Sequence, residues 1–154
     1  ALKPLVPAGA IQSSQGMAVS ADGAALYVAS YGYGIARVDL ATRAVSRVAA
    51  DTPAMLDGID GLARDGGALI AIRNGANPRA ILRLTLSADG ARIASVETLE
   101  RANPEWGEPT LGAVCDGVLL YNSDAQWERY PDGPTPDPAV PQRPTRVRAL
   151  RLRN

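Results

Sequence analysis

Three segments of the chain share one pattern, in which short apolar runs are separated by Asp-Gly or Gly-rich turns. They begin at Gly16, Gly61 and Thr110, so the pattern recurs every 45 to 49 residues. Each segment predicts a short strand, an Asp-Gly hairpin, a second apolar strand, a Gly- or Asn-rich loop and a third strand with alternating residues. In the first two segments a fourth strand is expected, around residues 44–49 and 92–97. Because no segment keeps a helical period, the pattern predicts an all-β protein.

The third strands of the segments align closely, as "IARVDL", "ILRLTL" and "VRALRL". A four-stranded antiparallel unit that recurs at this spacing is typical of a β-propeller blade. We therefore expect a single β-propeller domain over residues 1–154, with about three four-stranded antiparallel blades, half of a six-bladed ring. The expected blades cover approximately residues 12–50, 58–100 and 108–154.

The two ends of this pattern suggest how a ring could close. Residues 1–7 align with the outer strand of a preceding blade, and the last blade lacks a fourth strand of its own. One interpretation is half of a longer six-bladed chain, which an N-terminal half-propeller would complete. The alternative is a homodimer in which two copies exchange outer strands. Residues 131–145 lie in a stretch with six prolines, which predicts an extended loop that either caps one face or is recognised by an aromatic groove.

The composition of the chain excludes several kinds of partner and of catalytic site. The 154 residues include 16 basic and 16 acidic side chains, which argues against nucleic-acid and anionic-membrane partners. No apolar run approaches the roughly 20 residues of a membrane span. The chain has no histidine, which excludes Ser-His-Asp and Cys-His catalysis. Its one cysteine, Cys115, cannot form an intrachain disulfide and is expected to be buried. The many arginines and alanines suggest a bacterial source. The compartment, periplasm or cytoplasm, stays open.

Antiparallel blades predict which residues surround the central channel. The start of each first strand and the end of each second strand meet at one face, whereas the Asp-Gly hairpins of Asp22, Asp65 and Asp116 lie at the opposite face as turn residues. The residues expected around the channel mouth are Gln15, Tyr31, Tyr33, Asp60, Arg73, Asn74, Glu108, Asn122, Ser123 and Asp124.

Carboxylate and amide oxygens that converge without histidine or thiolate suit a hard divalent cation such as Ca²⁺, Mg²⁺ or Mn²⁺. Such a cation could polarise an ester carbonyl and activate water. The alternative is that Asp60 only accepts backbone N–H bonds at the start of its strand. Glu108, which precedes Pro109, is either a site residue or a strand-entry residue. Trp106 and Trp127 flank the last blade and serve either packing or ligand binding.

Two stretches, "SQGMAVSADGAALYVASYGYGIARVDLATRAV" and "LDGIDGLARDGGALIAIRN", resemble the C-terminal half of the senescence marker protein/gluconolactonase (regucalcin-like) family. The resemblance implies a six-bladed propeller that hydrolyses sugar lactones with one divalent metal in its channel. The aspartate ligand of the family falls on Asp60. Its asparagine ligand falls on Gln15, which is a departure in side-chain length, and its glutamate ligand belongs to a blade outside this sequence.

The first hypothesis is therefore a metal-dependent hydrolase that resembles sugar lactonases and acts on a small-molecule substrate. Asp60 is both catalytic residue and metal ligand, Gln15 is a second ligand, and the cofactor is one divalent cation, Ca²⁺ first and Mg²⁺ or Mn²⁺ as alternatives. The expected substrate-binding residues are Tyr33, Arg73, Asn74, Glu108 and Asn122. The second hypothesis is a non-catalytic propeller module of the NHL or YVTN type, which binds a protein or a carbohydrate. A structural half-propeller without a site is the third.

Overall fold

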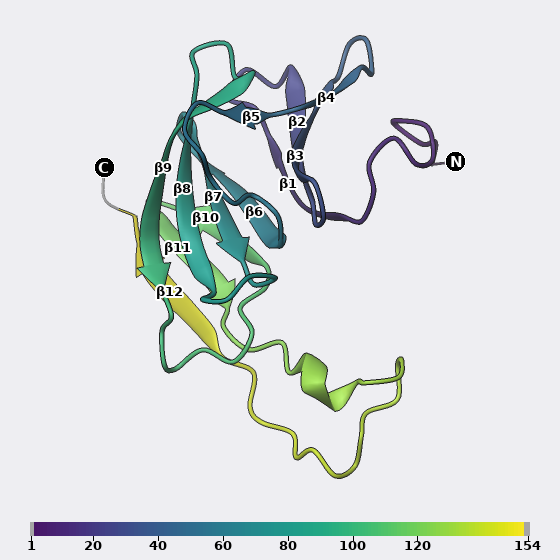
Figure 1. The fold of residues 1–154 in the computed structure, drawn as a ribbon, viewed down its shortest axis with the longest axis vertical. Coiled ribbons are helices and arrows are strands. Elements are labelled where there is room, and N and C mark those ends of the chain that lie inside the picture. The colour runs from purple at the N-terminus through teal and green to yellow at the C-terminus, as the bar shows by residue number, and fades with distance from the viewer. Residues whose placement is uncertain (1, 153–154) are drawn as a thin grey trace.

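A computed structural model describes residues 2–152, in which the strands form three sheets (Figure 1). The first sheet contains β1 (Ser14–Val19), β2 (Ala25–Ser30), β3 (Gly34–Asp39) and β4 (Val45–Arg47), in that order. The second has the order β5-β9-β8-β7-β6 and contains β5 (Ala49–Ala50), β6 (Ile59–Asp65), β7 (Ala68–Arg73), β8 (Ala80–Leu86) and β9 (Arg92–Arg101). The third contains β10 (Gly112–Cys115), β11 (Val118–Asn122) and β12 (Val147–Arg151). The predicted all-β, partial propeller is confirmed.

The second and third strands of each repeat pair in the same register; they are β2 with β3, β7 with β8, and β11 with β12. Leu26 lies opposite Val38 in the first sheet, Leu69 opposite Leu84 in the second, and Leu119 opposite Leu150 in the third. These pairs join positions that the repeat alignment treats as equivalent. Since a slip of one residue would turn every apolar side chain to the wrong face, the shared register follows from the shared pattern of burial.

Two features differ from the predicted blades. Strand β5 runs parallel to β9 of the second sheet, with Ala49 opposite Arg92, so that sheet has five strands. The third sheet has three strands within the described residues, and the last blade is expected to lack a fourth strand of its own. Residues 2–13 contain no strand, so the outer strand predicted at residues 1–7 is not formed over residues 2–7; residue 1 lies outside the described part.

The second sheet lies between the other two, and β7 has apolar side chains on both of its faces. Leu69 and Ala71 pack in a cluster with residues of the first sheet, among them Tyr27. Ile70 and Ile72 point the other way and pack with Leu119 of the third sheet. Because successive side chains of a strand alternate between faces, a strand buried on both faces must be apolar throughout. This explains the run "ALIAI" in the sequence.

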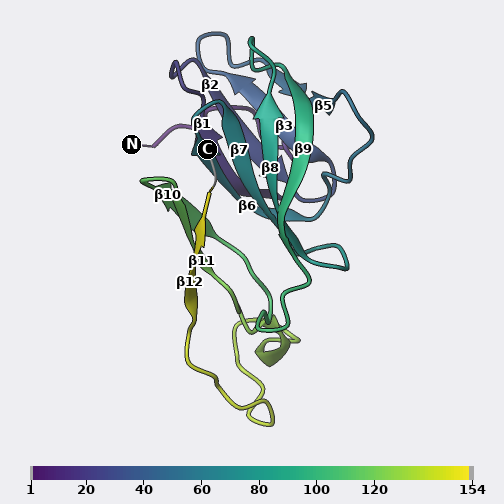
Figure 2. The ribbon, with the colours of Figure 1, turned by 90° about the vertical axis from the view of Figure 1, so that its left-hand side faces the viewer.

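The chain between β11 and β12 extends beyond the sheets (Figure 2). It carries the short 3₁₀ helix η1 (Trp127–Arg129) and the proline-rich residues 131–145, which form no strand, as predicted. No helix within residues 2–152 has the length and apolar character needed to cross a membrane. The expectation that Cys115 is buried is wrong, because this residue ends the edge strand β10, where its side chain is exposed.

Candidate functional site

The first strands of the first two sheets contain an irregularity at equivalent positions. In β1 the register with β2 shifts between Ser14 and Met17, and in β6 the register with β7 shifts between Ile59 and Gly61. Gln15 lies within the first irregularity and Asp60 within the second. A bulge inserts an unpaired residue and changes the direction of its side chain, which is why bulges are frequent at functional sites.

Two glycines allow the inner strands of neighbouring sheets to touch. A Cβ atom added to Gly16 would lie 2.7 Å from the carbonyl oxygen of Asp60, and one added to Gly61 would lie 2.4 Å from that of Thr110. Either distance is too short for a side chain, so only glycine permits this approach. The close packing places Gln15 beside the backbone of Asp60, and Asp60 beside the start of the third sheet.

Asp60 belongs to a hydrogen-bonded chain of three side chains. The Asn74 amide donates from Nδ2 to Oδ2 of Asp60 at 2.9 Å. The Tyr31 hydroxyl donates to Oδ1 of the same amide at 3.1 Å. With one end accepting and the other donating, the orientation of the buried Asn74 amide is fixed. The loops after β2 and β7, which belong to two different sheets, therefore hold the Asp60 carboxylate in one position.

Backbone packing under Tyr31 supports this chain. The N–H groups of Asn74 and Gly75 both donate to the carbonyl oxygen of Gly58 at 3.0 Å, and the N–H of Gly58 donates to the carbonyl oxygen of Tyr31 at 2.7 Å. A Cβ on Gly75 would lie 2.5 Å from the Tyr31 hydroxyl oxygen. The tyrosine thus rests directly on the loop backbone that carries Asn74.

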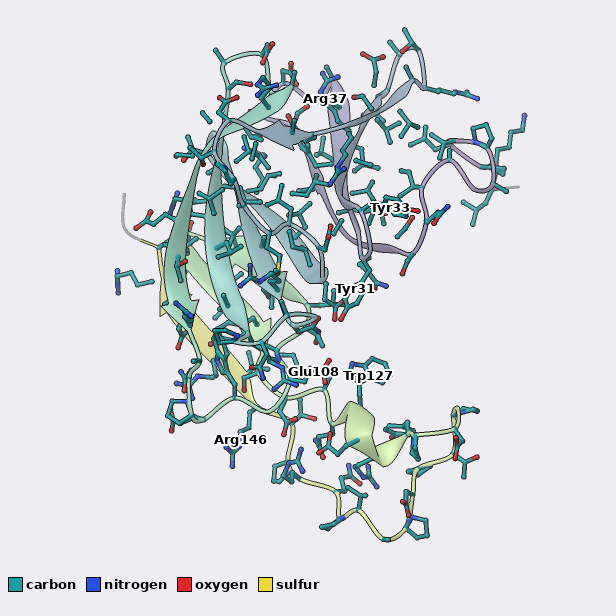
Figure 3. The ribbon with its side chains drawn as sticks, viewed as in Figure 1. Tyr31, Tyr33, Arg37, Glu108, Trp127 and Arg146 are labelled. Carbon is teal, nitrogen blue, oxygen red and sulfur yellow. The ribbon has the colours of Figure 1, made fainter. Side chains whose placement is uncertain are left out.

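Burial shifts the acidity of both ends of this chain. It raises the pKa of Asp60 above its ordinary value, and the hydrogen bond from Asn74 offsets part of that rise. The pKa of Tyr31 is also raised, first by burial and then by the negative charges of Glu108 and Asp60, while Arg79 acts in the opposite direction. Glu108 and Arg79 pair at 3.6 Å and are both partly exposed. Figure 3 shows Glu108 and Tyr31 at the same end of the sheets.

Other predicted site residues have structural contacts. The Arg73 guanidinium donates to the carbonyl oxygens of Met55 and Pro78, so it braces two loops. Tyr33 lines a hollow of ≈ 360 Å³ together with residues 9–12, β3 and β4, apart from Tyr31 (Figure 3). The side chain of Gln15 donates to Ser13 Oγ at 3.4 Å.

The loop after β11 is held by its own polar contacts. The side-chain oxygen of Asn122 accepts a bond from the Asp124 N–H at 3.1 Å. Asp124 is buried and accepts two bonds from Arg143, at 2.9 and 3.2 Å. Ser123 is fully buried, and its hydroxyl donates to the carbonyl oxygen of Arg146. These three residues stabilise the loop itself. The sequence pattern places them around the channel mouth and does not predict this structural role.

The hairpin aspartates lie in turns. Asp22 and Asp89 each accept bonds from a serine hydroxyl two residues earlier, at 2.6 Å, and from the backbone N–H two residues later, at 3.0 Å. These bonds lower the pKa of both carboxyls. Asp65 adds an ion pair to Arg83 at 2.8 Å.

Sequence reasoning missed Arg79, which contacts Glu108 from the loop before β8. Its Nε–H, like those of Arg37 and Arg73, is buried and has no acceptor within residues 2–152. The only local signal is the position of Arg79 between Pro78 and an apolar strand, which does not distinguish it from other arginines. In the described residues, no group of three or more His, Cys, Asp or Glu side chains could hold a metal ion.

Comparison with solved structures supports the propeller fold. The PQQ-bound aldose sugar dehydrogenase from Streptomyces coelicolor, a β-propeller, is similar with a TM-score of 0.60 and 20% sequence identity, over 79% of this chain and 40% of that one. The hydrazine synthase of Kuenenia stuttgartiensis is similar with a TM-score of 0.51 and 12% identity, over 80% of this chain and 32% of that one. This chain thus spans less than half the length of either protein.

No protein-family model matches the chain, and no curated protein sequence matches it. The findings therefore support a propeller but not membership of the gluconolactonase family.

Proposed function

We propose that this chain forms part of the substrate site of a β-propeller hydrolase that opens the ring of a sugar-derived lactone. The observation that carries the proposal is the hydrogen-bonded chain from Tyr31 through Asn74 to the Asp60 carboxylate. It holds a partly buried carboxylate with a raised pKa at the end of the sheets where the inner strands begin. Perturbed carboxylates of this kind are candidates for general bases.

In the proposed reaction Asp60 accepts a proton from water as the water oxygen attacks the lactone carbonyl carbon. The bond between that carbon and the ring oxygen then breaks, and the ring oxygen takes the proton from Asp60. Without a bound cation, burial raises the pKa of Asp60 and makes it a stronger base than an ordinary aspartate. A cation bound to Asp60 would lower that pKa and would itself activate the water. Asn74 keeps the carboxylate oriented, and Tyr31 keeps the Asn74 amide oriented. Glu108 and Arg79 offer an acceptor and a donor to the substrate hydroxyl and carbonyl groups.

A divalent cation, Ca²⁺ first, is part of the proposal, and the donors in this chain fit it in part. Asp60 provides a carboxylate, and Gln15 provides an amide oxygen from the neighbouring irregularity, both of them hard oxygen ligands. Ca²⁺ takes roughly six to eight oxygen ligands, so water, backbone carbonyls or other side chains would complete its coordination. When bound, the cation would polarise the lactone carbonyl and lower the pKa of water.

Asp60→Asn is the test, with Asp65→Asn as a matched control from the opposite end of the sheets. Turnover of glucono-1,5-lactone is followed with a pH indicator, with added Ca²⁺, and corrected for spontaneous hydrolysis. We expect Asp60→Asn to lower kcat by about 10²- to 10⁴-fold, and Asp65→Asn to leave it unchanged.

Wild-type turnover no faster than the spontaneous rate would refute the hydrolase. Binding of the lactone without turnover would support instead a non-catalytic, carbohydrate-binding module. Equal rates in Asp60→Asn and the wild type would remove Asp60 from the mechanism.

A further inference from the structure

The two tryptophans of the chain differ in their surroundings. The Trp106 indole N–H donates to the Tyr121 hydroxyl at 2.9 Å, and the two rings meet edge to face with 6.3 Å between centroids. The Trp127 side chain is 58% exposed, and within residues 2–152 it makes no hydrogen bond or ring contact. Trp106 therefore serves packing, and Trp127 presents an open aromatic face.

The segment that carries Trp127 is held firmly. The buried Gln126 side chain donates to the carbonyl oxygen of Arg143 at 3.0 Å and accepts from its N–H at 2.8 Å. The Arg143 guanidinium pairs with Asp124 and also with Glu128, within η1 itself. These bonds tie both ends of the loop that surrounds η1. Because the backbone around η1 is already braced, it loses little conformational entropy when a ligand binds the exposed ring.

This segment is joined to the site described above. The N–H of Ala125, two residues before Trp127, donates to the carbonyl oxygen of Glu108 at 2.9 Å. Glu108 is close enough to Tyr31 for its charge to raise the pKa of that hydroxyl. In Figure 3 the Trp127 ring projects from η1 toward the end of the sheets where Glu108 and Tyr31 lie.

We infer that Trp127 is a substrate-binding residue whose indole stacks against the C–H face of the sugar-type ring. The inference rests on the proposed function and deepens it, because it names a residue other than Asp60 that binds the ring of the substrate. The face of an aromatic ring is electron-rich and attracts the positively polarised C–H groups of a saturated ring. Glu108 and Arg79 then face the polar rim of the same ring. A hydroxylated ring with an exposed C–H face therefore fits this arrangement.

The test compares Trp127→Ala with Trp127→Phe in the full chain, after thermal unfolding has shown that both variants fold. For glucono-1,5-lactone we expect Trp127→Ala to raise KM about tenfold with little change in kcat, because stacking acts equally on substrate and transition state. Trp127→Phe retains an aromatic face and should restore most of the affinity. A merely structural role would not produce this split between KM and kcat or its rescue by phenylalanine.

A second measurement separates this inference from the proposed reaction. Tryptophan emission is titrated with 1,5-anhydroglucitol, a ring that cannot be hydrolysed. A change in wild-type emission that is lost in Trp127→Ala supports stacking even if the lactone is not turned over. Unchanged wild-type emission overturns the inference, as does an unchanged KM in Trp127→Ala. If Asp60→Asn abolishes turnover while Trp127→Ala leaves KM unchanged, the proposed reaction stands and the role of Trp127 falls.

Discussion

The packing of the second sheet against both of its neighbours can be tested by truncating two adjacent residues of β7. Leu69 points toward the first sheet and Ile70 toward the third, and both are fully buried. Removing a buried Leu or Ile side chain down to Ala costs about 2–5 kcal/mol, since apolar contacts are lost and a cavity remains. We expect both Leu69→Ala and Ile70→Ala to lower the free energy of unfolding by an amount in this range.

Urea unfolding followed by circular dichroism measures the effect. Leu120→Ala is the control, because the 46% exposed Leu120 side chain should cost less than about 1 kcal/mol. Ile70→Val, at about 0.5–1.5 kcal/mol, keeps the series measurable if the alanine variant does not fold. An Ile70→Ala variant no less stable than Leu120→Ala would refute the packing of the third sheet on the second.

Two further predictions concern single groups. Burial raises the pKa of Asp60 in the folded state above its value in the unfolded state. Its contribution to the free energy of unfolding is therefore most favourable at low pH and is lost as pH rises through the folded-state pKa. The stability of Asp60→Asn relative to the wild type should therefore increase between pH 3 and pH 7, roughly the range in which a shifted carboxyl titrates. A difference in urea midpoint that stays constant over this range would contradict the prediction. Tyr27, which is buried, donates to the carbonyl oxygen of Gly90 at 2.7 Å, so Tyr27→Phe should cost about 0.5–1.5 kcal/mol in thermal unfolding. The same change at the exposed Tyr33 should cost nothing measurable, and equal effects would argue against the buried bond.

The repeat pattern was enough to predict the sheets because it reflects burial. Apolar residues two apart in "IARVDL" and "ILRLTL" mark the faces of β3 and β8, and the Asp-Gly steps mark the hairpins. The short parallel strand β5 was not predictable in the same way, since two alanines have no pattern. The exposure of Cys115 was missed because a short apolar run does not distinguish an edge strand from a buried one.

The candidate site was predictable only as a set of positions. The antiparallel order of strands is enough to expect Asp60 and Asn74 at one end, because the first strand begins where the second ends. It does not determine what each side chain contacts. Arg73 and Asn74 are neighbours in sequence, yet one braces two loop carbonyls while the other binds the Asp60 carboxylate. That difference depends on which loops of other segments approach, and no local pattern encodes it.

The position of Asp60 arises from three local features that act together. The irregularity in β6 frees this residue from the regular ladder, and Gly16 and Gly61 let the neighbouring strands close around it. Gly75 then lets Tyr31 approach the loop that carries Asn74. A larger residue at any of these glycines would push the neighbouring segments apart and weaken the hydrogen bonds that hold Asp60. It would do so without contacting the side chain of Asp60 or of Asn74. The glycines that allow neighbouring sheets to pack closely are therefore also needed for the arrangement of the candidate site.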